Sequence, residues 1–399
     1  MLRLLRIHTV PSVAEEGGST WLQLFFDLVY VAILVELGNR LSHDMTLQGV
    51  LEFTFIFIPI WLSWLEFVNY GRHFPVDDIG QRLLTVFYMA FMLLLAFEIH
   101  AVTGATAGIF FLSYGFSKFV LALMYARAWA EFPNYREMTS HYTVAFIIGG
   151  LLWIGVALIS PLNLWFLGLV TALSLFMPAL IRLARKLRGV PELVMPPAKH
   201  LYMMHRFGEL TIIVLGEFFI KLATTTELRE LSAANLYFGL CLLGISVSIW
   251  WLYFDHLKHA GLTTPGSRIG FWIYSHYPFL ATIIAYGVVG QKIFTTTPGA
   301  PLTQAQQLMF TTALAIALLA YGAIEWASRE KAEPLYRRPQ PWVRVGSAAG
   351  LLALGIWGGT VNAGLLVSMV VAIFLFQVGL DVYKRLQHPE TLNLQEIKT

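Results

Sequence analysis

The chain has 399 residues, of which 57% are hydrophobic and 13% are charged, and its mean hydropathy is +0.65. Soluble domains contain about 25% charged residues, so this composition excludes an ordinary soluble protein and predicts an all-α, polytopic membrane protein. The formal net charge of +3 is small, and we expect no nucleic-acid partner. The single cysteine, Cys241, excludes a disulfide framework.

Taken in chain order, the apolar segments predict about twelve transmembrane helices, because each has the roughly 20 residues needed to cross a bilayer. Glycine, proline and charged residues separate most of them. For the last two segments, the alternative is one pair of shorter re-entrant helices. The predicted helices cover residues 21–43, 47–70, 81–103, 107–130, 139–160, 163–184, 202–225, 233–256, 268–291, 304–327, 342–360 and 363–384.

Lysine and arginine are distributed unevenly among the predicted loops. If the N-terminus is cytoplasmic, most of these residues fall in inner segments, and the outer segments contain only Arg40, Lys221, Arg229 and Lys292. An excess of basic residues on the cytoplasmic side is typical of membrane proteins. The distribution therefore predicts an even number of spans with both termini in the cytoplasm.

The first and seventh predicted helices resemble each other at a constant offset. Glu36 aligns with Glu217 and Arg40 aligns with Lys221, so each copy has a glutamate followed four residues later by a cation on one helical face. Six spans per half would give both halves the same orientation, which predicts two parallel six-helix pseudo-repeats. The predicted organisation is a cytoplasmic N-terminus at 1–19, a first half at 20–185, a basic cytoplasmic linker at 186–200, a second half at 201–386 and a cytoplasmic tail at 387–399.

Four stretches of the sequence resemble the bacterial low temperature requirement A family. They are LQLFFDLVYV near the start, FPVDD followed by Arg82, HRFGELTIIVLGE, and YSHYPFLATIIAYGVVG, so the resemblance extends over most of the chain. It implies an integral protein of the bacterial cytoplasmic membrane, in contact with membrane lipids. It implies no particular reaction, substrate or catalytic residue.

Carboxylates in the predicted outer halves of the spans form the first candidate site. Glu36 and Glu217 recur in both halves, and Glu98 lies late in the third span. One interpretation is a proton or cation site between the halves, where such carriers often bind their ligands. The other is pairing at helix ends, of Glu36 with Arg40 and of Glu217 with Lys221, with the charged groups reaching the interface.

Lys118 is predicted near the middle of the fourth span, where a lysine must be neutral or paired with a carboxylate. Glu36 and Glu98 are candidate partners. A structural pair and a role in substrate binding or coupling both remain open.

Histidine and acidic residues in the predicted second half form a further group. His205 and Glu209 are four positions apart on one helical face, and His276 lies in a later span. Such residues could relay protons or bind a metal, or they could be polar residues near a helix end. A divalent metal is not expected, because the spacing matches no common metal motif, and no cofactor is evident.

The loop between the second and third spans contains Asp77 and Asp78, followed by Arg82. Asp78 and Arg82 are four positions apart at a predicted helix start, where acidic residues also suit the helix dipole. The set predicts either a cytoplasmic gate or a structural pairing at the helix start. Asp27, near the inner end of the first span, could cap a helix or pair in the same layer.

The function best supported by these patterns is secondary transport of a small solute or ion, coupled to H⁺ or Na⁺ through intramembrane glutamates. The first alternative is a membrane-embedded enzyme or assembly factor that acts on lipid or envelope precursors. The second is an ion channel. The sequence contains no nucleotide-binding motif, so we do not expect the chain to be driven by ATP on its own. It predicts no oligomeric state.

Overall fold

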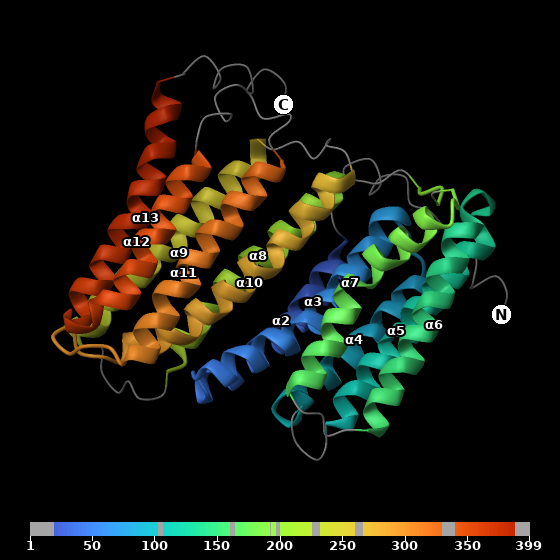
Figure 1. Cartoon of the computed structure of the whole chain (residues 1–399), viewed down its shortest axis with the longest axis horizontal. Coiled ribbons are helices and arrows are strands. Elements are labelled where there is room, and N and C mark those ends of the chain that lie inside the picture. The colour runs from blue at the N-terminus through green and yellow to red at the C-terminus, as the bar shows by residue number, and fades with distance from the viewer. Residues whose placement is uncertain are drawn as a thin grey trace. The chain divides into compact units, whose positions relative to one another are not determined.

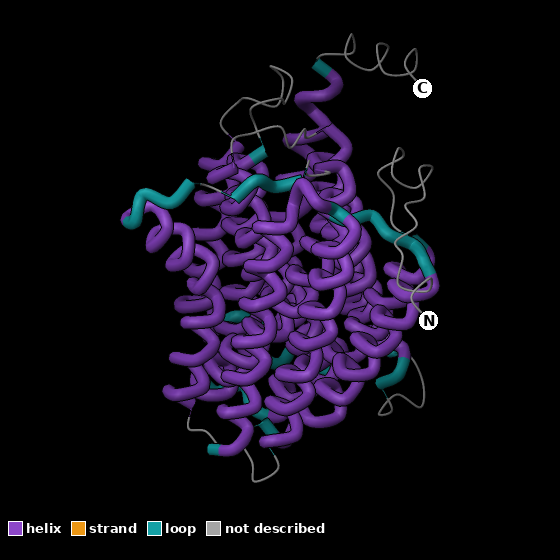
Figure 2. The backbone as a smooth tube through the Cα atoms, turned by 90° about the vertical axis from the view of Figure 1, so that its right-hand side faces the viewer, coloured by secondary structure: helices purple, strands orange, loops and turns teal. Residues whose placement is uncertain are grey.

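The computed structural model describes residues 20–102, 107–159, 164–191, 193–196, 200–225, 232–259, 266–328 and 340–387. Within these ranges the regular structure is helical (Figure 2), apart from isolated bridge residues such as the pair Pro301 and Asn362. The predicted N-terminal segment 1–19 lies outside the described residues. So do nearly all of the tail 387–399 and part of the linker 186–200.

α-Helices occupy each of the predicted ranges, with ends that differ by a few residues (Figure 1). They are α2 (Trp21–His43), α3 (Leu47–His73), α4 (Ile79–Glu98), α5 (Gly108–Glu131), α6 (Arg136–Leu158), α7 (Leu164–Leu187), α8 (His200–Ala223), α9 (Ala233–His259), α10 (Gly266–Phe294), α11 (Gln304–Ala327), α12 (Gln340–Trp357) and α13 (Ala363–Leu386). The short 3₁₀ helices η2 (Ile99–Ala101), η3 (Pro133–Tyr135) and η5 (Gly358–Thr360) extend three of their ends.

Nine helices in the described part of the chain are long and apolar enough to cross a membrane. They are α2 to α6, α9 to α11 and α13, whereas α7, α8 and α12 are not among them. The protein is therefore a multi-pass helical membrane protein. The count of about twelve transmembrane helices stays a prediction.

The chain divides into two compact units, Met1–Ile213 and Val214–Thr399, and the boundary falls inside α8. In the first unit α5 packs against α4 and α6, and α4 also packs against α2. In the second unit α11 packs between α10 and α12, and α9 packs against α13. The arrangement of helices into two parallel pseudo-repeats stays a prediction.

Polar residues fix where several of these apolar helices begin. Thr20 and Gln23 form a reciprocal capping box at α2, because the Thr20 hydroxyl accepts from the Gln23 amide at 3.3 Å and the Gln23 side chain accepts from the Thr20 amide at 3.0 Å. Thr46 caps α3 through its hydroxyl, and the Asp78 carboxylate caps α4. These caps satisfy amide groups that no helical carbonyl can reach, which matters most at a membrane boundary.

Candidate functional site

A fully buried ion pair joins α2 to the N-terminal half of α8 inside the first unit. Asp27 and Arg206 are both 0% exposed, and Nη2 of Arg206 lies 2.6 Å from Oδ1 of Asp27. Trp64 of α3 donates its indole N–H to the same oxygen at 2.8 Å. Glu209 extends the group, with Oε2 3.5 Å from Nη1 of Arg206. Asp27 and Glu209, two predicted site residues, thus share one arginine.

Several buried polar atoms around this pair have no hydrogen-bond partner among the described residues. They include Oδ2 of Asp27, Nε of Arg206 and the hydroxyls of Tyr30 and Tyr202. A buried polar group without a partner costs about 1–3 kcal/mol, so native proteins usually satisfy such groups with protein, water or ligand atoms. The cluster therefore keeps hydrogen-bonding capacity for a water or ion.

A second ion pair, between a buried lysine and a partly exposed glutamate, joins α3 to α5. Nζ of Lys118 forms a short hydrogen bond with Oε2 of Glu66 and lies 4.4 Å from the ring centroid of Tyr114. Of the two states predicted for Lys118, neutral or paired with a carboxylate, the structure shows a pair, but the candidate partners Glu36 and Glu98 were wrong. Glu66 and Lys118 each lack an opposite charge three or four positions away on their own helix, and that shared feature could have identified the pair.

The start of α4 contains two distinct ion pairs. Asp78 caps the helix by accepting from the Gln81 amide at 2.8 Å, and Arg127 of α5 donates to both of its carboxylate oxygens at 2.8 and 3.0 Å. Arg82 pairs with Asp77, because its Nε and Nη2 donate to Oδ1 and Oδ2 of Asp77 at 2.7 and 3.0 Å. The predicted pairing of Asp78 with Arg82 is therefore wrong, because Asp78 turns inward to Arg127.

The stability that the Asp77–Arg82 pair contributes depends on pH. The hydrogen bonds from Arg82 lower the pKa of Asp77 below its ordinary value. Because the pKa is lowered in the folded state, the pair contributes stability above the ordinary aspartate range, near pH 3.9, and loses it as the pH falls. The pair is therefore fully formed at neutral pH.

The predicted residues at the other end of α2 contact neighbouring segments. Arg40 lies 2.5 Å from Glu52 of α3 and donates to the carbonyls of Ile99 and His100 at 3.2 and 2.8 Å. Glu36 is 38% exposed and lies 3.0 Å from the His100 ring. Each of the two charges thus has a partner outside α2, so the predicted pairing of Glu36 with Arg40 is not what the structure shows.

Glu98 lies half-buried at the last position of α4, where η2 begins. The structure does not bring it to Lys118, whose carboxylate partner is Glu66.

Glu217 and Lys221 form the predicted pair one helical turn apart in the second unit, with 3.2 Å between Oε1 and Nζ. Both side chains are largely buried, whereas the aligned Glu36 is far more exposed. The two glutamates that the repeat aligns therefore have different surroundings.

The second unit also contains a buried group that sequence reasoning missed. Arg344 of α12 lies 3.4 Å from Glu325 of α11 and 3.1 Å from Asp381 of α13, and it also bonds to Gln377. Its guanidinium carbon lies 5.1 Å from the ring centroid of Tyr321. Arg344 lies near the start of its helix, where a flanking cation is ordinary, and it was not among the predicted site residues. Glu325 and Asp381, which are carboxylates within the apolar helices α11 and α13, could have indicated this group in the sequence.

The two predicted histidines lie in contrasting surroundings. His205 is exposed on α8, whereas His276 is fully buried. Nε2 of His276 lies 2.9 Å from the Tyr253 hydroxyl, and Nδ1 lies 2.8 Å from the Trp272 carbonyl. Among the described residues, no three His, Cys, Asp or Glu side chains come together as a metal-binding group.

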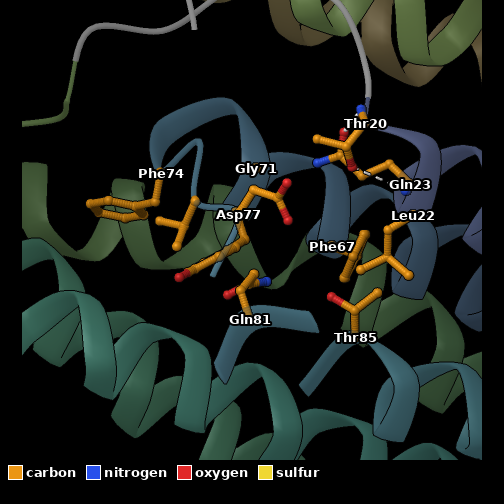
Figure 3. A pocket seen from close by; sticks show the side chains of 11 residues that line it. Thr20, Leu22, Gln23, Phe67, Gly71, Phe74, Asp77, Gln81 and Thr85 are labelled. Atoms are coloured by element: carbon orange, nitrogen blue, oxygen red, sulfur yellow. Dashed lines mark hydrogen bonds between the residues drawn. The ribbon is translucent and has the colours of Figure 1, made fainter. Parts of the chain in front are cut away.

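A polar pocket, here called the α2–α3–α4 pocket, lies where α2 and α4 begin and α3 ends (Figure 3). Aromatic rings such as Phe67 and Phe74 form part of its wall. Its polar lining consists of Thr20 and Gln23 from the start of α2, Tyr70 from α3, Asp77 from the loop, and Gln81 and Thr85 from α4.

Gly71 lies in the wall of this pocket, in the last turn of α3. A Cβ atom at this position would overlap the Tyr202 hydroxyl of α8 and stand 3.3 Å from Nε2 of Gln23. The glycine thus permits the close approach of Tyr202 and Gln23 to the α3 backbone.

Gly71→Ala is expected to destabilise the protein by about 1–3 kcal/mol, the usual cost of overpacking a close contact. Tyr202→Phe removes the overlapping hydroxyl, so the double variant Gly71→Ala/Tyr202→Phe should recover most of the loss. Thermal unfolding of the detergent-solubilised variants measures both effects. Equal destabilisation in the single and double variants would contradict this contact.

These features define the protein as a multi-pass α-helical membrane protein whose helices hold buried ion pairs. A family model described as "Bacterial low temperature requirement A protein (LtrA)" matches residues 18–379, and the chain belongs to this family. The chain is also similar to an uncharacterized protein of Rhizobium meliloti (strain 1021), with 24% identity over 293 residues that make up 69% of each chain.

Proposed function

We propose that this protein is a secondary transporter of a small solute or ion, coupled to H⁺ or Na⁺, in the bacterial cytoplasmic membrane. The observation that supports the proposal most is the Asp27–Arg206 pair, which is fully buried between two helices and has unsatisfied polar atoms beside it. Ionisable residues inside membrane helices are costly, and where they occur they often mark ion or proton pathways.

The proposed coupling depends on the two states that such a pair can adopt. With Asp27 ionised, its carboxylate neutralises Arg206. A proton or cation that binds Asp27 cancels this attraction and leaves the guanidinium to seek another anionic or polar partner. A solute that interacts with Arg206 in only one of these states would be coupled to the ion by their differential affinity.

The other predicted charges have subsidiary places in this proposal. The Lys118–Glu66 pair supplies a second internal charge pair in the same unit. Glu217 with Lys221 is proposed as its counterpart in the second half, and Glu36 with Arg40 as a site near the outer ends of the first helices. Asp77, Asp78 and Arg82 are proposed as a cytoplasmic gate.

Transport is tested with the purified protein in liposomes that contain a pH-sensitive dye. Addition of Na⁺, K⁺, small organic cations, amino acids and sugars in turn should produce an internal pH change for at least one class of solute. Empty liposomes and liposomes with heat-inactivated protein serve as controls. A proton conductance that no solute changes would favour a channel, and no protein-dependent flux with any solute would contradict the proposal.

The proposed topology places both termini and residues 186–200 in the cytoplasm. In a Cys241→Ala background, single cysteines at Met45 and Thr297 should react with a membrane-impermeant thiol reagent added to intact cells, because both positions lie in proposed outer loops. A cysteine at Val190 should react only after the cells are opened. Labelling of Val190→Cys in intact cells would contradict this orientation.

A further inference from the structure

The α2–α3–α4 pocket reaches into the first unit from the end at which α2 begins. Thr20 and Asp77 are partly exposed, whereas Tyr70, Gln81 and Thr85 are buried in the wall. The space is large enough for a water molecule, which needs polar partners as well as room.

The buried wall of the pocket offers such partners. The Tyr70 hydroxyl and Oε1 of Gln81 have no hydrogen-bond partner among the described residues, and both side chains are more than nine-tenths buried. The Tyr70 hydroxyl can donate and accept a hydrogen bond, and Oε1 of Gln81 can accept one, so together they suit a bound water. The pocket is thus built to hold water rather than an apolar group.

Two polar side chains near this pocket lie one helical turn from the residues of the buried ion pair. Gln23 lines the pocket and lies four residues before Asp27 on α2, so both side chains share a helical face. Tyr202 lies four residues before Arg206 on α8 and approaches Gly71 closely. Gln23 and Tyr202 therefore form a polar layer about one helical turn, or roughly 5 Å, from the Asp27–Arg206 layer.

We propose that the α2–α3–α4 pocket is the aqueous entrance of a proton path to Asp27, with Gln23 and Tyr202 as the connecting layer. This inference rests on the proposed function, in which Asp27 couples transport to an ion. A proton from a hydronium in the pocket passes along water molecules and the Tyr202 hydroxyl to Oδ2, the unpartnered oxygen of Asp27, while the Gln23 amide holds these waters by hydrogen bonds. The carboxylate becomes a neutral carboxyl group, and its attraction to Arg206 is lost.

Water access is tested with cysteine variants in the Cys241→Ala background. Gln23→Cys should react with the small cationic reagent 2-aminoethyl methanethiosulfonate added from the cytoplasmic side of membrane vesicles. The matched control Leu34→Cys lies on the same helix but is buried among apolar residues, and it should not react. Adding Gly71→Ala, whose methyl group crowds Gln23 and Tyr202, should slow the reaction of Gln23→Cys.

The deeper part of the path is tested with Asp27→Cys combined with Arg206→Gln, which removes both charges and leaves neither unpaired. This variant should react more slowly than Gln23→Cys but still from the same side. If it is not monodisperse, Tyr30→Cys takes its place in the experiment, because Tyr30 lies three residues beyond Asp27 on α2. Failure of Gln23→Cys to react overturns the entrance, and failure of the deeper cysteine overturns the path to Asp27.

The labelling results do not depend on transport. If the cysteines react but the protein shows no solute-dependent proton flux, the pocket is accessible to water and the proposed function is contradicted. Solute-dependent flux without labelling would contradict only the path. Where flux is present, Tyr202→Phe should slow proton movement but leave exchange of labelled solute across the membrane unchanged.

Discussion

Replacing Arg206 with glutamine is expected to lower the free energy of unfolding by about 3–5 kcal/mol, because Asp27 then remains as a buried charge without its partner. Asp27 is fully buried, and the indole N–H of Trp64 also donates a hydrogen bond to it. Unfolding of the detergent-solubilised protein, followed by tryptophan fluorescence, measures the loss. The matched control is Arg188→Gln, an exposed arginine on which we expect almost no effect.

The double variant Asp27→Asn/Arg206→Gln tests the pairing directly. Because neither residue then carries a charge, most of the lost stability should return, and the two substitutions should be strongly non-additive. Additive losses would contradict the pairing. The same variant is suited to transport measurements because it separates the charge of the pair from the folding of the protein.

Replacing Lys118 with methionine is expected to have an effect of similar size, about 3–5 kcal/mol, because Glu66 loses its partner among aromatic and apolar side chains. Glu66→Gln in the Lys118→Met background should restore most of the stability. We also expect Lys118→Met to abolish gradient-driven accumulation of solute. Normal accumulation by the stable double variant Lys118→Met/Glu66→Gln would show that this pair is structural only.

The helices were predictable because each is a long apolar run, and glycine, proline or charged residues separate most of these runs. α2 is the clearest case, since Thr20 and Gln23 form a capping box at the start of a mostly apolar stretch. The membrane class followed from the same composition. The number of crossings stays a prediction, because α7, α8 and α12 are not among the nine helices of the described chain that are long and apolar enough to cross a membrane.

The site was predictable residue by residue but not as pairs. Asp27 and Lys118 were recognised because a charge inside an apolar run is costly, and both are indeed buried. Their partners were missed for two different reasons. Arg206 lies near the start of its helix, where an unpaired cation is ordinary, and Glu66 was not among the predicted site residues.

The repeat illustrates a further limit of sequence reasoning. Glu36 and Glu217 align in the sequence, yet one is 38% exposed beside His100 and the other is largely buried beside Lys221. Burial depends on which neighbouring helix covers a given face, and the helix's own sequence does not contain that information. The fully buried charges at Asp27 and Arg206 are therefore stronger candidates for coupling than the aligned glutamates.

The most direct test of the account is solute accumulation in liposomes under an imposed pH gradient, once a responsive solute has been found by internal pH measurements. The wild-type protein should accumulate the solute against its concentration gradient. The variant Asp27→Asn/Arg206→Gln should exchange labelled solute without accumulating it, because it has no group whose charge changes. Undiminished accumulation by this variant would contradict the claim that the buried pair couples transport to protons.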